Sequence, residues 1–296
     1  MSSIVRRSIL YAQNFLKSSC LVDSLLDRYG IGPGDMLYEI GPGKGIITEC
    51  LARRCKQVVA IEKDPQLVAA LRRRFANTPN ITIHEGDFLQ FRLPNVHYKV
   101  FANIPFNIST AIVTKLTTAA YPPDDGYLIM QKEAAERFLG KRGESLYAVL
   151  LKPWFEPEIV HRFKRNDFVP APRVDVVMLR LRKRGPPLIK RNDTQMFHDF
   201  VVYGFTAWQP SLRSTFKGIF TARQFKHIAR SLDFDLDATP TSLRFEQWLG
   251  LFDYFKRIGN GQSLQVIAGS EQRLKQQQAA LQKIHRSRIQ RKRGSE

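Results

Sequence analysis

Cysteine is scarce in this sequence of 296 residues. The chain has three, Cys20, Cys50 and Cys55, and their number and spacing suit neither a disulfide framework nor a zinc site. No window of about 20 residues is free of charged side chains, so we expect no membrane-spanning helix. The first 16 residues contain two arginines but no apolar block with a small-residue cleavage site, so we expect no secretory signal. These absences predict a cytoplasmic chain.

Histidine is nearly as scarce, with six residues in the chain. No two of them have the i,i+4 spacing of a helical metal site, and none has a cysteine beside it. We therefore expect no metal ion. The six are His84, His97, His161, His198, His227 and His285.

Acidic side chains are too few to balance the basic ones. The chain has 46 Lys and Arg against 27 Asp and Glu, a formal net charge of +19. Such an excess predicts a polyanionic partner, because phosphates release counterions when they bind basic side chains. No strongly apolar face accompanies the basic residues, so nucleic acid is favoured over an anionic membrane surface. The last 35 residues (262–296) hold 8 basic and 2 acidic side chains, which predicts a flexible basic tail or, alternatively, a merely solubilising one.

Apolar runs alternate with amphipathic segments from about residue 30 onwards. This alternation predicts an α/β fold with a parallel sheet and helices on both faces. Two further extended runs, 158–163 and 174–182, predict an antiparallel edge hairpin, which gives a seven-stranded, mostly parallel sheet. The other strands are expected at 36–40, 57–62, 81–87, 98–106 and 125–133, and the helices between them at 46–54, 65–76 and 109–119.

The segment 182–192 contains one glycine, two prolines and clustered charges, which indicates a linker. Beyond it, four amphipathic stretches predict a small all-α domain, with Thr221 and Thr241 as expected helix caps. We therefore expect an α/β domain over 1–182, a helical domain over 183–261 and the tail over 262–296. The four helical stretches are 194–208, 211–220, 221–232 and 241–257.

A glycine-rich loop follows the first predicted strand. Gly41 and Gly43 let the backbone turn sharply and approach a ligand closely. Glu62 ends the second strand 21 positions after Gly41, where an acidic side chain accepts hydrogen bonds from a ribose diol. The dinucleotide fingerprint G-x-G-x-x-G fails, because Ile46 and Thr48 stand where its last glycine would be needed.

The spacing instead favours a cofactor with one nucleoside and no pyrophosphate, such as S-adenosylmethionine. Asp87 follows the third strand, where it would accept a hydrogen bond from the cofactor's adenine amino group. The alternative is that Asp87 merely forms a turn with Gly86.

The fourth strand is followed by Asn103, Ile104, Pro105 and Phe106. An exocyclic amine on a base is a poor nucleophile, because its lone pair is delocalised into the ring. The Asn103 side-chain oxygen and a backbone carbonyl near Ile104 would accept the two amine hydrogens and favour tetrahedral nitrogen. Pro105 would make the turn rigid and Phe106 would stack on the base. The alternatives are a turn cap for Asn103 and a core aromatic for Phe106.

With these motifs the chain resembles the ribosomal RNA adenine N(6)-methyltransferase and dimethyltransferase family. The fold of that family is the Rossmann-like fold of class I methyltransferases. The resemblance implies that Asn14 and Leu16 contact the cofactor, with Gly41, Glu62, Asp87 and Asn103. It also implies that Phe168 is a second aromatic beside the target adenine, whereas the residues alone suggest a core position. The matching motifs are YAQNFL (11–16), EIGPGKG, VVAIEKD, EGDFLQF, FANIPFNIST, MQKEAAERFLG and DFVPAPRVD (167–175).

The family has two main bacterial branches. One methylates an adenine of 23S rRNA and confers macrolide–lincosamide–streptogramin B resistance, and the other dimethylates adenines of 16S rRNA during ribosome maturation. YAQNFL and NIPF resemble the resistance branch, and WQPSLRSTF (208–216) replaces a QRRKT-like segment of the maturation branch. The resemblance thus implies a monomeric 23S rRNA methyltransferase with catalysis in 1–182 and RNA binding in 183–261. The 16S enzyme and a non-catalytic rRNA-binding assembly factor remain alternatives.

Overall fold

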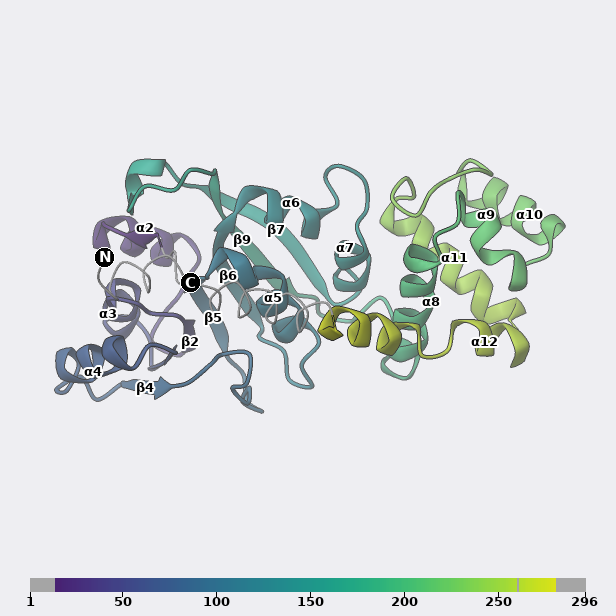
Figure 1. The fold of residues 1–296 in the computed structure, drawn as a ribbon. Coiled ribbons are helices and arrows are strands. Elements are labelled where there is room, and N and C mark those ends of the chain that lie inside the picture. The colour runs from purple at the N-terminus through teal and green to yellow at the C-terminus, as the bar shows by residue number, and fades with distance from the viewer. Residues whose placement is uncertain (1–13, 260, 281–296) are drawn as a thin grey trace, which may run out of the picture. The chain divides into compact units, whose positions relative to one another are not determined.

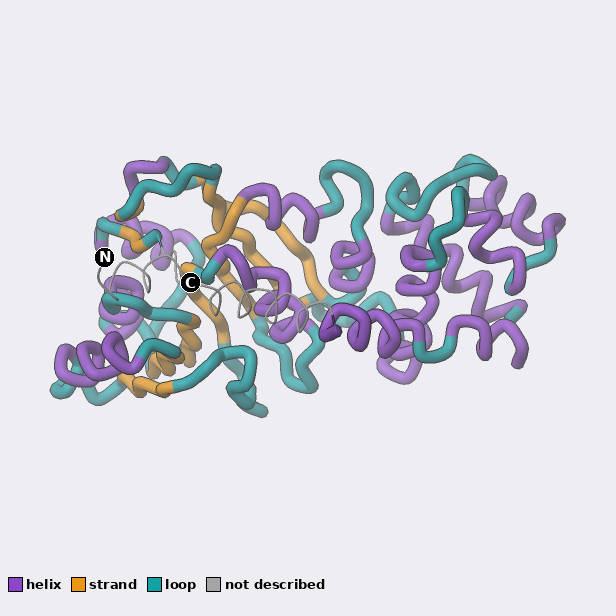
Figure 2. The backbone as a smooth tube through the Cα atoms, in the orientation of Figure 1, coloured by secondary structure: helices purple, strands orange, loops and turns teal. Residues whose placement is uncertain are grey.

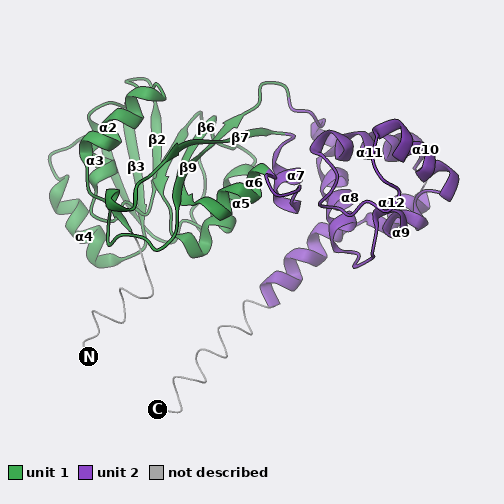
Figure 3. Ribbon diagram, turned by 90° about the horizontal axis from the view of Figure 1, so that it is seen from above, with its two compact units in different colours: residues 1–139, 154–186 green, residues 140–153, 187–296 purple. Residues whose placement is uncertain are grey.

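The computed structural model describes residues 14–259 and 261–280, which form two compact units. The first unit comprises residues up to 139 together with 154–186, and the second comprises 140–153 and the residues from 187 onwards (Figure 3). The named strands of the described residues all belong to the first unit, whereas the second is built from helices and loops (Figure 2).

A seven-stranded sheet forms the centre of the first unit, in the order β4-β3-β2-β5-β6-β9-β7 (Figure 1). The five strands from β4 to β6 pair in parallel, and β9 pairs antiparallel with both β6 and β7. The predicted seven-stranded, mostly parallel sheet is therefore confirmed. The strands are β2 (Met36–Ile40), β3 (Gln57–Glu62), β4 (Ile81–Glu85), β5 (Lys99–Asn103), β6 (Asp125–Gln131), β7 (Phe155–Arg162) and β9 (Val176–Lys183).

The helices of this unit are α2 (Ser19–Arg28), α3 (Ile46–Ala52), α4 (Pro65–Arg74), α5 (Ser109–Thr117) and α6 (Lys132–Leu139). Helices α2 and α3 pack on the sheet through apolar side chains that recur at helical spacing, such as Val22, Leu26 and Leu51. They meet Phe101 of β5 and Tyr127 of β6, which lie in the same buried cluster. Burial of this face holds α3, and with it the loop that precedes it, at one edge of the sheet.

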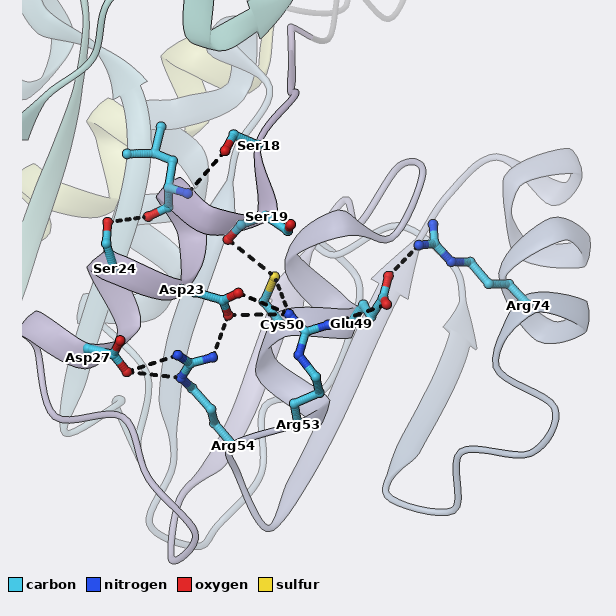
Figure 4. A network of polar contacts seen from close by, with 11 residues as sticks. Ser18, Ser19, Asp23, Ser24, Asp27, Glu49, Cys50, Arg53, Arg54 and Arg74 are labelled. Atoms are coloured by element: carbon cyan, nitrogen blue, oxygen red, sulfur yellow. Dashed lines mark hydrogen bonds and ion pairs between the residues drawn. The ribbon is translucent and has the colours of Figure 1, made fainter.

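A network of charged side chains joins α2, α3 and the end of α4 on the outer side of this layer (Figure 4). Arg54 binds both Asp23 and Asp27 of α2, and its contact with Asp27 measures 2.9 Å. Arg74, the last residue of α4, pairs with Glu49 and donates to the Lys44 carbonyl at 2.5 Å. Arg74 thus ties α4 to the glycine-rich loop.

Two short strands bring the N-terminal motif against a later one. In β1 (Phe15–Leu16) and β8 (Phe168–Val169), which are antiparallel, Leu16 pairs with Phe168. The Lys17 N–H also donates to the Asp167 carbonyl at 2.9 Å. Residues about 150 positions apart in the sequence therefore lie side by side in the first unit.

The helices of the second unit surround an aromatic core. Phe200 of α8 lies 4.9 Å from the ring of Phe216, and Trp248 of α11 is fully buried. The helical elements are α7 (Leu146–Leu151), α8 (Thr194–Thr206), α9 (Leu212–Thr215), the 3₁₀ turn η4 (Phe216–Gly218), α10 (Ala222–Leu232), α11 (Phe245–Ile258) and α12 (Gly261–Ile267). The segment 140–153, which contains α7, packs with this unit although it precedes the linker in the sequence.

One of the two predicted caps is confirmed. Thr221 caps α10, since its hydroxyl accepts from the Gln224 N–H at 3.2 Å. The expectation for Thr241 is wrong, because α11 begins only at Phe245. The cap of α11 is Arg244, three residues after Thr241. The Gln247 side chain accepts from the Arg244 N–H at 2.7 Å.

The first part of the expected tail is helical and ordered against α8. The Glu271 N–H donates to Asp199 at 2.8 Å, and its carboxylate lies 3.3 Å from His198. Residues 270–280 continue as helix, whereas 281–296 lie outside the described residues. Across 14–259 and 261–280, every helix is too short or too polar to cross a bilayer.

Gly45, the residue before α3, tests how tightly this packing constrains the glycine-rich loop. Its φ is +82°, and a Cβ there would lie 2.8 Å from Leu71 and 2.9 Å from Phe75. We expect Gly45→Ala to destabilise the protein by about 2–4 kcal/mol, from left-handed backbone and overpacking together. Urea unfolding followed by circular dichroism measures this. Gly32→Ala is the control, since a Cβ there would meet nothing within 4 Å. Equal midpoints for the two variants would contradict the expectation.

Candidate active site

The strand order of the sheet reverses between β2 and β5. From β2 the chain proceeds to β3 and β4 on one side, and from β5 to β6 on the other. Ligands of open α/β sheets bind at such a reversal, beyond the carboxyl ends of the strands. A pocket lies at this point of the first unit. It is lined by Phe15, Leu16, Glu39, Gly41, Pro42, Lys44, Ile46, Ile47 and Asn103.

The glycine-rich loop follows β2 and needs its glycines. Gly41 and Gly43 have φ of +65° and +58°, a region that side chains with a Cβ disfavour. The Gly41 N–H donates to the Ile61 carbonyl of β3 at 2.9 Å, and the Gly43 N–H donates to the Glu62 carboxylate at 3.1 Å. The loop is therefore held to the end of the neighbouring strand.

Glu62 is buried at the end of β3 and its carboxylate is fixed in place. Besides the Gly43 N–H, it accepts from the N–H groups of Lys63 at 2.8 Å and Asp64 at 3.0 Å. A ribose diol would share a carboxylate that already accepts three backbone hydrogen bonds. A carboxylate offers about four acceptor sites, so one contact fits without any exchange of partners.

Asp87 lies just after β4 and outside the residues that line the pocket. One of its oxygens accepts from the Leu89 N–H at 2.9 Å, so Asp87 forms a turn with the residues that follow it. The other accepts from the Lys63 ammonium at 2.7 Å. Burial acts to raise the pKa of Asp87, but the Lys63 and Leu89 hydrogen bonds outweigh it and lower that pKa. A ligand amino group would therefore meet an ionised carboxylate, in competition with Lys63.

Asn103 ends β5 and lines the pocket. Its side-chain Nδ2 donates to the Asn14 carbonyl at 2.6 Å. This bond joins the N-terminal motif, which contains Asn14, to the motif that begins with Asn103. This bond assigns the amide nitrogen, so the side-chain oxygen Oδ1 is the group left to accept a hydrogen. Among the described residues, no donor occupies that oxygen.

The residues after Asn103 form a tight turn. The Ile104 N–H donates to the Ile129 carbonyl of β6 at 3.1 Å, and no described donor occupies the Ile104 carbonyl. Pro105 has φ of −60° and directly precedes a 3₁₀ turn (Phe106–Ile108). The Phe106 ring is half-buried against the cluster beneath α2 and α3, so part of it remains accessible.

Phe168 occupies a core position. Its side chain is 1% exposed, and its ring lies 5.4 Å from that of Phe163. A base could stack on Phe168 only after neighbouring side chains moved. Its role beside the target adenine therefore stays a prediction, whereas Leu16, its partner across β1 and β8, does line the pocket.

The sequence analysis did not select Glu39, which also lines the pocket. Its side chain is 1% exposed, and the Thr48 hydroxyl donates to it at 2.6 Å. Burial raises the pKa of Glu39 to about 8, with the Thr48 hydrogen bond opposing and the charge of Glu62 adding to the rise. The available signal was an acidic residue inside the apolar run MLYEI (36–40), directly before the glycine loop.

The sheet order, the glycine loop at its reversal and the acidic end of β3 together define the Rossmann-like fold of methyltransferases. The chain belongs to the ribosomal RNA adenine dimethylase family, whose model matches residues 5–257. This confirms the resemblance that the motifs indicated and makes the chain a member of an enzyme family.

Relatives of two named kinds are similar to the chain. An rRNA adenine N-6-methyltransferase of Bacillus licheniformis is 32% identical over 243 residues, which cover 81% of this chain and 84% of the relative. A ribosomal RNA small subunit methyltransferase A of Nostoc punctiforme is 30% identical over 271 residues, covering 83% and 94%. Among solved structures, the 23S rRNA methyltransferase ErmE has a TM-score of 0.74 and 29% identity, covering 82% of this chain and all of that one.

The buried carboxyl of Glu39 gives a pH-dependent prediction. Because its folded-state pKa of about 8 lies above the ordinary value of 4.5, the folded chain keeps a proton that the unfolded chain loses between those values. Stability from this group is complete below about pH 4.5 and is lost as the pH rises towards 8. We therefore expect Glu39→Gln to gain stability relative to wild type from pH 5 to pH 8.

Urea unfolding at several pH values measures this difference. The exposed Glu133 supplies the control for exchanging a carboxyl for an amide, as Glu133→Gln. A difference between Glu39→Gln and wild type that stayed constant over the pH range would show that the Glu39 carboxyl is not held neutral by the fold.

Proposed function

We propose that the chain transfers a methyl group from S-adenosylmethionine to the exocyclic amine of an adenine in 23S rRNA, and so confers macrolide–lincosamide–streptogramin B resistance. The observation that carries this proposal is the hydrogen bonding of Asn103, a residue that lines the pocket at the sheet reversal. Its amide nitrogen donates to the Asn14 carbonyl, and its oxygen accepts from no donor among the described residues. The likeness to ErmE, which extends over that whole chain, favours 23S rRNA as the target.

The residues present fit S-adenosylmethionine better than a dinucleotide. Two carboxylates, those of Glu62 and Asp87, lie at the ends of β3 and β4. They would repel a pyrophosphate, whereas hydroxyl and amino groups are donors that carboxylates accept. When bound, the cofactor supplies an electrophilic methyl group on sulfur.

Each candidate residue has a defined part in holding this cofactor. Glu62 would accept from the ribose, and Asp87 from the adenine amino group once Lys63 moves aside. Gly41 and Gly43 let the loop backbone approach closely. Asn14 and Leu16 would cover the cofactor from the side of β1. Leu16 lines the pocket, and Asn14 is hydrogen-bonded to Asn103, which also lines it.

Asn103 and the turn after it prepare the target amine. The Asn103 oxygen and the Ile104 carbonyl would accept its two hydrogens, which localises the lone pair on nitrogen and makes it a better nucleophile. Pro105 fixes the direction of the turn through its restricted φ. Phe106 offers a ring face to a base that has left its stack, a contact worth about 1–3 kcal/mol.

We assign the reaction and RNA binding to different parts of the chain. The residues proposed for the cofactor and the reaction lie within 1–182. We propose RNA binding for the helical domain over 183–261, whose 12 basic and 7 acidic side chains leave it positive, and a supporting role for the basic residues of 262–296. Ribosomal RNA is then the partner of a monomeric enzyme in the cytoplasm.

The 16S rRNA enzyme remains the second candidate, because the small-subunit methyltransferase of Nostoc punctiforme is similar over 271 residues. A non-catalytic assembly factor is disfavoured, since such a protein has no need of an Asn103 oxygen without a donor in a pocket that is also lined by the buried carboxyl of Glu39. The experiment that separates the targets is incubation with radiolabelled S-adenosylmethionine and protein-free 23S or 16S rRNA, followed by mapping of the labelled nucleotide. We expect label on one adenine site of 23S rRNA, whereas label confined to 16S rRNA would overturn the proposed target.

Two variants should separate reaction chemistry from cofactor binding. Asn103→Ala removes an acceptor needed in the transition state, so we expect methyl transfer to slow about 10²–10³-fold. Asp87→Ala removes a cofactor contact, so we expect it to weaken S-adenosylmethionine binding far more than Asn103→Ala does. Single-turnover rates and titration calorimetry measure the two effects.

Asn107→Ala is the matched control, because Asn107 is an exposed asparagine four positions beyond Asn103. It should retain both rate and cofactor affinity. An Asn103→Ala enzyme that methylated at the wild-type rate would contradict the proposed role of its oxygen, and unchanged cofactor affinity in Asp87→Ala would contradict that of Asp87.

A further inference from the structure

The second unit carries a stretch of positive charge without compensation. Between Asp199 and Asp233 the sequence contains five basic side chains and no acidic one. All five are exposed, and none forms an ion pair with a described carboxylate. They are Arg213, Lys217, Arg223, Lys226 and Arg230. Paired surface arginines such as Arg54 in the first unit already have protein partners, whereas these five are open to an external anion.

Trp208 lies in the same stretch and is 98% exposed. It occupies the loop between α8 and α9, and no described ring contacts it, whereas Trp248 is fully buried. Its φ of +51° is also one that bulky side chains rarely adopt. An indole in water forgoes the gain from burial, and left-handed backbone adds a cost, so the fold of the chain alone does not explain a tryptophan here.

The helical turns after Trp208 expose two of these five basic side chains, Arg213 and Lys217, to solvent. Ser211 caps α9 by accepting from the Ser214 N–H at 3.3 Å, and Leu212 and Phe216 are fully buried. Arg213 and Lys217, four positions apart on the same run of turns, are the exposed side chains of this segment. The buried pair therefore anchors the turns while the two cations face solvent a few residues from Trp208.

We propose that Trp208 stacks on an unpaired base of the RNA while Arg213 and Lys217 bind neighbouring phosphates. The inference rests on the proposed function, which supplies the RNA. An aromatic face accepts any base, and the indole has only two side-chain torsions to immobilise. Gln209 and Pro210 beside Trp208 are exposed and offer no apolar belt, so the surface suits a planar base with phosphates rather than lipid chains.

Binding of the full-length protein to protein-free 23S rRNA and to 16S rRNA, measured separately by filter retention over a range of salt concentrations, tests this contact. We expect W208A to weaken binding of the RNA that the enzyme methylates about 5- to 150-fold. The dependence of affinity on salt should not change, because stacking releases no counterions. K217A should instead lower the slope of log affinity against log salt by about 0.7, the value for one single-strand phosphate contact. W208F keeps an aromatic face and should keep most of the affinity.

Tyr121→Ala is the control for the loss of an exposed aromatic, since Tyr121 of the first unit is 57% exposed. It should bind RNA as wild type does. Tryptophan emission gives a second readout: the chain has three tryptophans, and RNA should quench the exposed Trp208 in wild type and have far less effect in W208F. Circular dichroism of W208A should match wild type, because Trp208 buries nothing in the fold.

Equal affinity of W208A and wild type for both RNAs would overturn the stacking contact. So would a W208F enzyme as weak as W208A, or emission that shifts to the blue on anionic phosphatidylglycerol vesicles and is not quenched by RNA. The proposed function fails by a different result, the absence of methyl label from 23S rRNA, and W208A can still be compared with wild type on whichever RNA is labelled.

Discussion

The hydrogen bond from the Asn103 side chain to the Asn14 carbonyl organises the site. An asparagine amide has one donor end and one acceptor end, and the 2.6 Å contact commits the donor end to the protein. The acceptor end is then left without a donor among the described residues, and a free acceptor is what the proposed amine substrate requires. The same bond holds the N-terminal motif at the end of β5, where β1 is already paired with β8. One contact therefore joins the segments proposed to cover the cofactor and to bind the target amine, which are 89 positions apart in the sequence.

Much of the fold followed from the pattern of apolar residues. The strands at 36–40 and 57–62 have the predicted bounds, because each is a short apolar run followed directly by a polar or glycine-rich turn. Other features depend on contacts that no local pattern carries. Residues 140–153 precede the linker yet pack with the helical unit, and 262–280 carry no strong apolar stripe yet are held through Glu271 to His198 and Asp199. Polar partners of this kind come from a distant element, so their sequence gives no periodic signal.

The site residues divide in the same way. The positions of Gly41, Glu62 and Asn103 at the carboxyl ends of the strands were predictable, because parallel strands end at one edge of a sheet and glycine loops and polar residues at those ends collect there. Gly41 and Asn103 line the pocket, whereas Glu62 does not. Glu39 was missed because its place is defined by burial, which only the packed α3 and the Thr48 hydroxyl create. The sequence motif of Phe168 suggested a role in binding, yet the side chain is buried beside Phe163. A motif locates a segment, whereas the exposure of its side chain depends on the tertiary fold.

The acidic groups of the site raise an electrostatic problem for any enzyme that acts on RNA. Carboxylates suit a nucleoside cofactor, but each unit of negative charge near the pocket repels the phosphates of the substrate. The structure reduces that charge in two ways. Burial raises the pKa of Glu39 so that it holds a proton near neutral pH, and Lys63 pairs with Asp87 at 2.7 Å. Glu62 is withdrawn behind three backbone N–H groups. The second unit carries five exposed basic side chains that form no ion pair with a described carboxylate, Arg213, Lys217, Arg223, Lys226 and Arg230. In the proposed function, recognition of the cofactor and attraction of the nucleic acid therefore fall to different units of one chain, and neither charge pattern has to be weakened for the other.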